Sequence, residues 1–455
     1  MLRRLNPFRS LDNPKEVWAW GMYDLANQSF TLLIITLLFP IYFKKVIVGD
    51  DVRGDALWSI AGSGSLLIVV LLSPLVGAAA DAYGIKKRLL VLSGVACAAL
   101  TVMLAVIGAG MVAVAMAAFI AANIVYQLGE NLLAGFLPEI SNSRNIGRIS
   151  ATGWTMGYVG ALVLQVLVVG GMLAFGLADT LNWWWFFILA GLWFAAGIVP
   201  PALILREVRA AEPRERQSLL RATFSRLAET MRRAREFRQL RVFLTSFFVY
   251  ALGVQTVIYF AGIIANDFGL SDVKLMLFAL QLSLTAGIAA VATGLYQDRI
   301  GAVTTVAVFL GVWILTAAGL LGLTLIPAGS RADNEWMFWV VGNGVGLGLG
   351  GIGTASRSVV GLFTPRHKTA EFFGLWGMTY KFAGVVGVLM FGQVKALVGN
   401  SASMVVLLAF FVAGLVLLTR VNGGAGVRAA KRAERVQARA YALDNDRRNP
   451  RTETE

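Results

Sequence analysis

Charge is scarce in this sequence. Asp, Glu, Lys and Arg together make up 15% of it, whereas a soluble domain carries roughly 25%. One cysteine, Cys97, excludes an intramolecular disulfide, and one histidine, His367, leaves no His/Cys cluster for a metal. The sequence also lacks a phosphate-binding GxxxxGK[ST] motif and the HExxH and GxSxG motifs. We therefore expect no metal, no cofactor, no ATP-driven pumping and no enzymatic activity.

Apolar residues dominate instead. They make up 57% of the chain, and the mean hydropathy is +0.70. A globular core cannot bury that much apolar surface, but a bilayer can, at roughly 20 residues for each crossing. Twelve apolar segments are long enough to cross, at about 18–46, 56–80, 88–109, 111–136, 149–175, 183–204, 241–266, 273–296, 301–326, 335–362, 370–396 and 401–419.

These segments predict helices, because a backbone in hydrocarbon must satisfy its own hydrogen bonds. The ten-residue alternation of a membrane barrel is not seen. The start of the chain, residues 1–16, is polar and basic, and the apolar run after it is too long for a cleaved signal peptide. The fold class we predict is an all-α integral membrane protein with twelve transmembrane helices in two six-helix bundles.

The basic residues follow the connecting segments. Most of the 40 Lys and Arg lie in one alternating set of connections that includes both ends of the chain. The opposite set holds few: Lys44, Lys45, Arg53, Lys274, Arg331 and Lys395. The positive-inside rule then places both termini in the cytoplasm, and we expect a multi-pass protein of the cell (inner) membrane. The net charge of +14 reflects this topology, so we do not expect nucleic acid as a partner.

The longest internal connection divides the helices six from six. We predict a first bundle over 1–204, a cytoplasmic linker over 205–240, a second bundle over 241–420 and a cytoplasmic tail over 421–455. The linker has an apolar stripe at helical spacing among many arginines, which predicts a helix on the membrane surface. The tail loses its apolar periodicity after about Ala440, and we expect its end to be disordered.

A short motif repeats in the two halves. Gly77, Asp81 and Gly84 follow the second apolar segment in the pattern GxxxDxxG, and Gly294, Asp298 and Gly301 follow the eighth in the same pattern. Two related halves suit alternating access, in which one rocks against the other. We predict a gating role for both loops, with Arg299 included.

The motif resembles a known signature. GxxxDxxG followed by Lys86, Lys87 and Arg88 is similar to the loop signature of the major facilitator superfamily. The chain departs from it at Ala82, where a basic residue is expected, and after Gly301, where the basic cluster is missing. The resemblance implies that the glycines allow close helix approach and that the Asp latches the cytoplasmic face.

Further stretches look like one branch of that superfamily, the vacuole effluxer-like (autophagy-22-type) transporters. They cover nearly the whole chain: YDLANQSF from Tyr23 with FPIYF from Phe39, Asn131 to Glu139, Ser150 to Gly153, Gly157 to Gly160, Ser356 to Ser358, AEFFG from Ala370, and Lys381 with Phe382. Departures stand at Thr354, where the branch often has Gln, and Val388, where it often has Pro. The resemblance implies amino-acid export as a candidate role.

Polar residues inside the apolar segments are candidates for the site, because each is costly in a bilayer. The first segment carries Asp24, Asn27, Gln28 and Thr31 on one helical face, next to Tyr23. The fourth carries a second polar stripe at i, i+4, i+7 and i+8. Its members are Asn123, Gln127, Glu130 and Asn131. Two such faces predict a shared aqueous cavity.

Depth along the helices groups the charges. At about 1.5 Å per residue, Asp24, Glu130 and Arg357 fall in one layer, and Lys381 lies deeper, beside Tyr380. Asp24 or Glu130 is the candidate for proton coupling, and Lys381 or Arg357 for a substrate carboxylate. The alternative is an ion-pair network that only holds the cytoplasmic side together.

Three other features have simpler interpretations. The aromatic run at Trp183 predicts an interfacial belt, and Glu371 predicts a helix cap. The glycine run from Gly342 to Gly353 resembles a dinucleotide motif but predicts close helix packing. We also expect His367 to be solvated.

The sequence thus predicts a secondary active transporter, a symporter or antiporter, that moves a small polar solute by alternating access. We expect a monomer whose partners are a small-molecule substrate, a coupling ion (a proton) and the lipid bilayer. Three alternatives remain open. They are a lipid or hydrophobic-compound transporter (flippase) of the same fold, a membrane enzyme, and a channel or non-transporting sensor.

Overall fold

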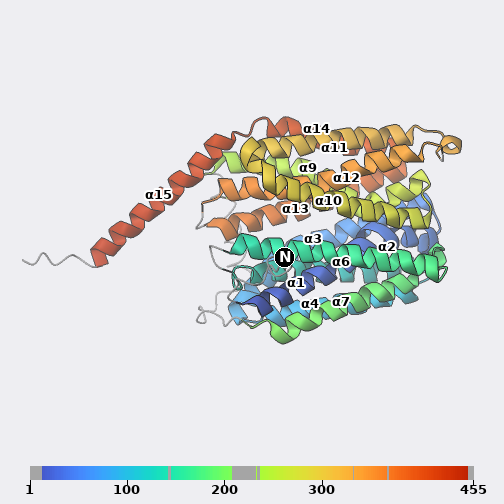
Figure 1. Ribbon diagram of the computed structural model, residues 1–455, viewed down its shortest axis with the longest axis horizontal. Helices are drawn as coiled ribbons and strands as arrows, with labels where there is room; N and C mark the ends of the chain where they lie inside the picture. The colour runs from blue at the N-terminus through green and yellow to red at the C-terminus, as the bar shows by residue number, and fades with distance from the viewer. Residues whose placement is uncertain are drawn as a thin grey trace, which may run out of the picture.

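A computed structural model describes residues 13–141, 145–207, 232, 236–331, 333–365 and 368–448. The described residues form helices joined by short loops (Figure 1). The linker between the halves falls almost entirely outside these ranges, and so does His367. The predictions of a surface helix and of a solvated histidine therefore stay predictions.

The first crossing is one run of 35 residues, Pro14–Val48. It is α-helical over α1 (Pro14–Ser29) and α2 (Leu38–Tyr42), and π-helical over η2 (Phe30–Leu37) and η3 (Phe43–Val48). Pro40 lies in this run and cannot donate a backbone hydrogen bond. Wide π turns often accompany functional sites, and here they begin at Phe30, between Gln28 and Thr31 of the polar face.

The other long helices match the predicted segments to within a few residues. They are α3 (Asp51–Tyr83), α4 (Lys86–Met103), α5 (Val112–Phe136), α6 (Ile146–Ala174), α7 (Trp184–Ile204), α9 (Arg238–Phe268), α10 (Asp272–Ile300), α11 (Ala302–Thr324), α12 (Glu335–Phe363), α13 (Thr369–Leu397) and α14 (Asn400–Leu418). Short 3₁₀ turns η4 (Leu104–Val106), η5 (Thr180–Asn182) and η6 (Ala328–Ser330) lie in the connections.

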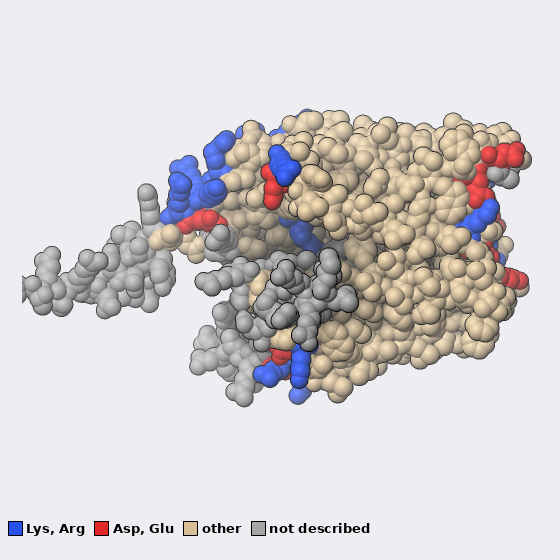
Figure 2. All heavy atoms as spheres, in the orientation of Figure 1, with Lys and Arg blue, Asp and Glu red and all other residues tan. Residues whose placement is uncertain are grey.

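Eleven helices of the described part are long and apolar enough to cross a membrane by length and composition. The twelfth is α12, whose many glycines lower its hydropathy although it has 29 residues. Large apolar side chains face outward along the flank, among them Leu71, Leu92, Val166, Val291 and Leu315. Figure 2 shows this uncharged flank between two ends that carry charged residues. The all-α membrane fold is confirmed.

The helices pack in two groups. In the first, α1 lies against α6 and α7, and α4 against α5 and α7; in the second, α12 lies against α10 and α11, and α9 against α13 and α14. Between the groups, α3 packs along α13, α6 along α10, and the η2–α2 region against α9. Figure 1 shows the groups as upper and lower layers. We refer to α1–α7 as the first half and to α9–α15 as the second.

The glycine run of α12 is a packing seam, as predicted. A Cβ on Gly342, Gly346 or Gly350 would collide with α10, and one on Gly344 or Gly348 would collide with α11. At Gly350 it would lie 1.9 Å from the carbonyl oxygen of Ala286. The seam allows α12 to pass between two neighbours and so fixes the position of its polar C-terminal part.

The tail begins with a long helix. α15 (Gly423–Arg448) continues past Ala440, and the predicted disorder concerns the end of the chain, which lies outside the described residues. Ala and Arg, which favour helices, are the commonest residues of α15 as a whole, and their propensity supports its helical form. α15 projects from the end at which α1 and α9 begin (Figure 1). We call this the basic end, because the predicted basic connections lie there.

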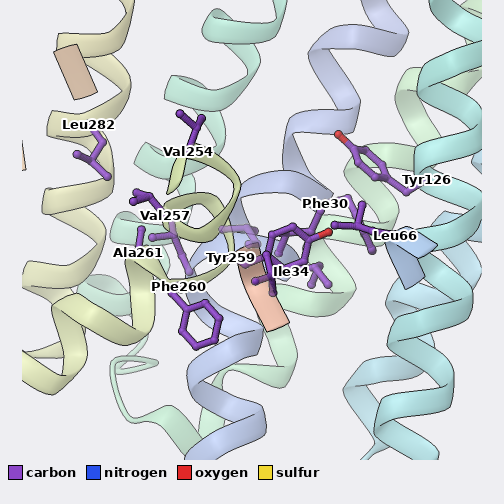
Figure 3. Packing of buried hydrophobic residues seen from close by; sticks show 14 of the residues in the cluster. Phe30, Ile34, Leu66, Tyr126, Val254, Val257, Tyr259, Phe260, Ala261 and Leu282 are labelled. Carbon is purple, nitrogen blue, oxygen red and sulfur yellow. The ribbon is translucent and has the colours of Figure 1, made fainter. Parts of the chain in front are cut away.

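The two halves contact each other from the middle of the molecule to the end opposite the basic end. Figure 3 shows Phe30, Ile34 and Leu66 of the first half gathered around Tyr259 of the second. Each of these side chains is buried. At the basic end, Figure 2 shows a recess with Lys or Arg side chains inside it. We therefore describe the conformation as open at the basic end.

Candidate functional site

Two carboxylates of the first half share one amide, and we call the polar residues around them the central site. Asn27 is fully buried, and its Nδ2 donates to Glu130 on α5 and lies 3.5 Å from Asp24 Oδ1 on α1. The carboxylates themselves are half-buried. The structure thus brings the two predicted polar faces together at Asn27.

Two cations of the second half face these acids. Lys381 Nζ on α13 donates to Gln127 Oε1 of α5 at 2.5 Å, and it lies within electrostatic range of Glu130. Arg357 on α12 lies within electrostatic range of Asp24 and over the ring of Trp376, 5.9 Å from its centroid. Acids therefore come from one half and bases from the other.

Aromatic rings flank the cations. Trp376 and Tyr380, one turn apart on α13, have nearly parallel rings 6.5 Å apart, and Phe247 of α9 packs against both. Tyr380 also accepts a hydrogen bond at its backbone oxygen from Gln255. Its ring therefore belongs to an apolar wall beside Lys381.

The far side of the site is closed by a polar contact between the halves. Asn123, fully buried one turn from Gln127, donates to Ser65 Oγ of α3 at 2.7 Å and to Tyr259 Oη of α9 at 2.9 Å. Beside it, Thr31 and Tyr126 hydroxyls lie 2.6 Å apart. Asn123 therefore joins the two halves beside the central site.

The comparisons with known proteins show the family of the chain. The family model described as "Vacuole effluxer Atg22 like" matches residues 46–431. The chain belongs to this family.

Two relatives match this chain in sequence over different shares of its length. The MFS-type transporter YxiO of Bacillus subtilis is 26% identical over 427 residues, which cover 90% of this chain and 95% of YxiO. Autophagy-related protein 22 of Yarrowia lipolytica is 24% identical over 297 residues, 60% of this chain and 50% of that protein. The match thus spans half the length of this fungal relative.

Solved structures show the same fold. The nucleoside transporter NupG superposes with a TM-score of 0.64 at 13% identity, over 89% of this chain and 96% of NupG. The D-xylose-proton symporter gives 0.65 at 13% identity, over 90% and 97%. The predicted membership of the major facilitator superfamily is confirmed, and this Atg22-like chain is an MFS-type secondary transporter.

Two predicted site residues of the Atg22-like transporter lie elsewhere. Tyr23 is buried within the first half, against Phe194 of α7 and next to Gly129 of α5. Asn131 donates to Ser73 Oγ of α3 at 2.7 Å and lines a separate small pocket near the basic end. These contacts lie within the first half, although Tyr23 is within electrostatic range of Glu130. Helical periodicity could not distinguish Tyr23 and Asn131 from the other predicted site residues, because each continues a polar face on its own helix.

The first gating motif forms an ion pair, as its chemistry suggested. Lys86 Nζ lies 3.0 Å from Asp81 and 2.5 Å from Glu139. Gly84 ends α3 with φ +61°, a conformation that glycine adopts readily. No described atom lies within 4 Å of a Cβ built on Gly77, so this glycine is not at a close helix contact here. The open basic end accounts for that difference.

The second motif is arranged differently. Asp298 and Arg299 are exposed, and Arg299 lies over the ring of Tyr296, 6.0 Å from its centroid. Gln297 instead makes the link to α12, through Ser358 Oγ at 2.8 Å. Gly294 has open space around it, and Gly301 has φ +88°. The gating role of both motifs stays a prediction.

Sequence reasoning missed four charged residues at the opposite end, Lys44, Asp55, Asp267 and Lys395. They are mutually paired between the halves. Each lies near a helix end, where charges are ordinarily solvated, so its position alone gave no signal. Among the described residues, no group of three or more His, Cys, Asp or Glu is arranged for a metal.

Proposed function

We propose that this transporter is proton-coupled and exports a small solute that carries both charge signs, an amino acid or a related metabolite, across the cell membrane. The observation that supports this most is the division of charge at the central site. Asp24 and Glu130 belong to the first half, while Arg357 and Lys381 belong to the second. The description of the family as effluxers supports the direction.

The division of charge favours a zwitterion. An ammonium group fits beside the two carboxylates, and a carboxylate fits beside the guanidinium and the ammonium of the second half. A solute held in this way touches both halves at once. Its binding would then favour the conformation in which the halves approach around it, which alternating access requires.

Proton coupling is supported by the shared amide. Asp24 and Glu130 both lie at Asn27 Nδ2, and a proton on either acid removes the repulsion between two negative charges. Proton uptake and solute binding at the same carboxylates would link the two fluxes. The D-xylose-proton symporter, which shares the fold, shows that the fold is compatible with this coupling.

The coupling is tested in proteoliposomes with a mixture of radiolabelled amino acids and an imposed pH gradient. Asp24→Asn should abolish gradient-driven accumulation but keep counterflow exchange, because an amide binds solute polar groups but does not titrate. Gln28→Glu, one turn away on α1, is the control for a change of charge on this face. Accumulation by the Asn variant equal to wild type would refute the coupling role.

The substrate is tested by thermal unfolding of the purified protein with single amino acids and metabolites. A solute that binds only the folded state at 100 times its Kd adds about 2.7 kcal/mol to stability. Lys381→Ala should remove the shift, while Lys274→Ala, which removes a surface pair with Glu335, should keep it. Shifts with lipids or hydrophobic compounds alone would favour the flippase alternative.

A further inference from the structure

Four buried charges close the end of the molecule opposite the basic end. Lys44 of η3 and Asp55 of α3 come from the first half, and Asp267 of α9 and Lys395 of α13 come from the second. Their side chains are exposed by only 3%, 4%, 15% and 5%, respectively. Figure 2 shows charged side chains at this end, away from the recess. The proposed transport site uses none of them.

The four groups form a closed ring of alternating sign. Lys44 lies 2.8 Å from Asp267, Asp267 lies 2.7 Å from Lys395, and Lys44 lies 3.4 Å from Asp55. Lys395 and Asp55 complete the ring with a direct ion pair. Asp51 also approaches Lys44, at 3.4 Å, but its side chain is 74% exposed, so water screens that contact.

The ring has two kinds of contact. Lys44–Asp267 and Lys395–Asp55 join the halves, whereas Lys44–Asp55 and Lys395–Asp267 lie within one half. When the halves separate at this end, only the first two contacts break. Each half then keeps one neutral pair, so no charge is left alone.

The partner that each charge keeps on opening matters energetically, because a buried charge without a partner is strongly unfavourable. A lock made of two simple cross-pairs would leave isolated charges on opening. We propose that these four residues are the gate of this end, an ion-pair lock that holds it closed in the conformation described here and opens without leaving an unpaired charge. The neighbouring polar contacts, Gln393 of α13 with Ser59 of α3 at 2.9 Å and Trp58 with the Tyr259 backbone oxygen at 2.9 Å, break at the same time.

The ring can be tested with variants that keep the amino-acid composition of the protein unchanged. The exchange Lys44→Asp with Asp55→Lys keeps the first half neutral and keeps its internal pair, but makes both cross-contacts repulsive. Adding Asp267→Lys and Lys395→Asp restores every contact with the signs reversed. The double exchange should open this end, and the fourfold exchange should close it again.

The measurement is the distance between spin labels in the full-length protein, in detergent and in lipid nanodiscs. Cys97→Ser removes the native thiol, and Val52→Cys with Val398→Cys places labels on exposed residues of the two halves at this end. Tyr83→Cys with Ile300→Cys, both exposed near the basic end, reports the reciprocal change. No substrate is needed.

In the double exchange we expect the population at longer Val52–Val398 distance to rise about tenfold or more, because two attractive contacts at short range become repulsive. The Tyr83–Ile300 distance should shorten, and the fourfold exchange should reverse both changes. A wild-type distance distribution in the double exchange would overturn the proposal. So would a double exchange whose opening the fourfold exchange leaves unchanged, since simple disruption of packing would behave in that way.

Discussion

Asn123→Ala isolates one contact between the halves. Asn123 Nδ2 donates to Ser65 within the first half and to Tyr259 in the second. Separation of the halves at this level breaks only the bond to Tyr259. The hydrogen bond to Tyr259 exists only when the halves are in contact. Its loss in Asn123→Ala therefore destabilises the closed arrangement and not the separated one.

The size of the effect follows from that difference. One hydrogen bond contributes about 0.5–1.5 kcal/mol, which is about a two- to tenfold change in an equilibrium constant at about 1.4 kcal/mol per decade. Burial places the expected value in the upper part of this range, because the buried Tyr259 side chain loses its donor. We expect the variant to shift toward opening at the end opposite the basic end.

The assay is the Val52–Val398 label distance, with Asn131→Ala as the matched control. Asn131 lies two turns further along α5, and its bond goes to Ser73 of the same half. Both variants should lose comparable thermal stability, but only Asn123→Ala should change the distance distribution. An equal shift in the two variants, or no shift in either, would show that the contact with Tyr259 does not hold the halves together.

Two further predictions concern the scaffold of the site. Gly350→Ala should lower the free energy of unfolding by about 1–3 kcal/mol, the usual effect of overpacking, because its Cβ meets the backbone of α10; Gly353→Ala, with open space around it, should not. Thermal unfolding followed by tryptophan fluorescence checks both, and equal losses would contradict the packing seam. At the basic end, Asp81→Asn should change the free energy of unfolding by less than about 1 kcal/mol, because the carboxylate is 71% exposed and exposed pairs contribute little. Lys86→Met should cost more, because it leaves the largely shielded Glu139 without its cation, and the reverse order in unfolding experiments would argue against this assignment.

The twelve crossings could be predicted from the sequence because the bilayer fixes both the length and the polarity of a spanning helix. The central site could be predicted in part for a similar reason. Asp24 and Glu130 lie in long apolar runs, where a charge is conspicuous, and their helical spacing placed each on a polar face. The glycine seam of α12 was also predictable, since small residues at short spacing allow helices to approach.

Contacts between helices could not be predicted from the sequence. Nothing in the spacing of Tyr23 or Asn131 shows that the first points into its own half and the second toward Ser73. In the sequence, Lys44 and Lys395 have the positions of ordinary interfacial charges. Their burial depends on pairing between distant residues, and Asp55 and Lys395 are 340 positions apart. Such pairing depends on how α3 packs along α13, which a single sequence does not state.

The two sets of charges differ in a way that bears on their roles. At the central site, the two acids lie on one half and the two bases on the other. In our proposal a solute or a proton binds between these groups, as a coupling site requires. In the ring at the opposite end, each half holds one acid and one base, so separation demands no ligand. We therefore propose that coupling takes place at Asp24 and Glu130 and closure at the ring, although both consist of the same kinds of side chain.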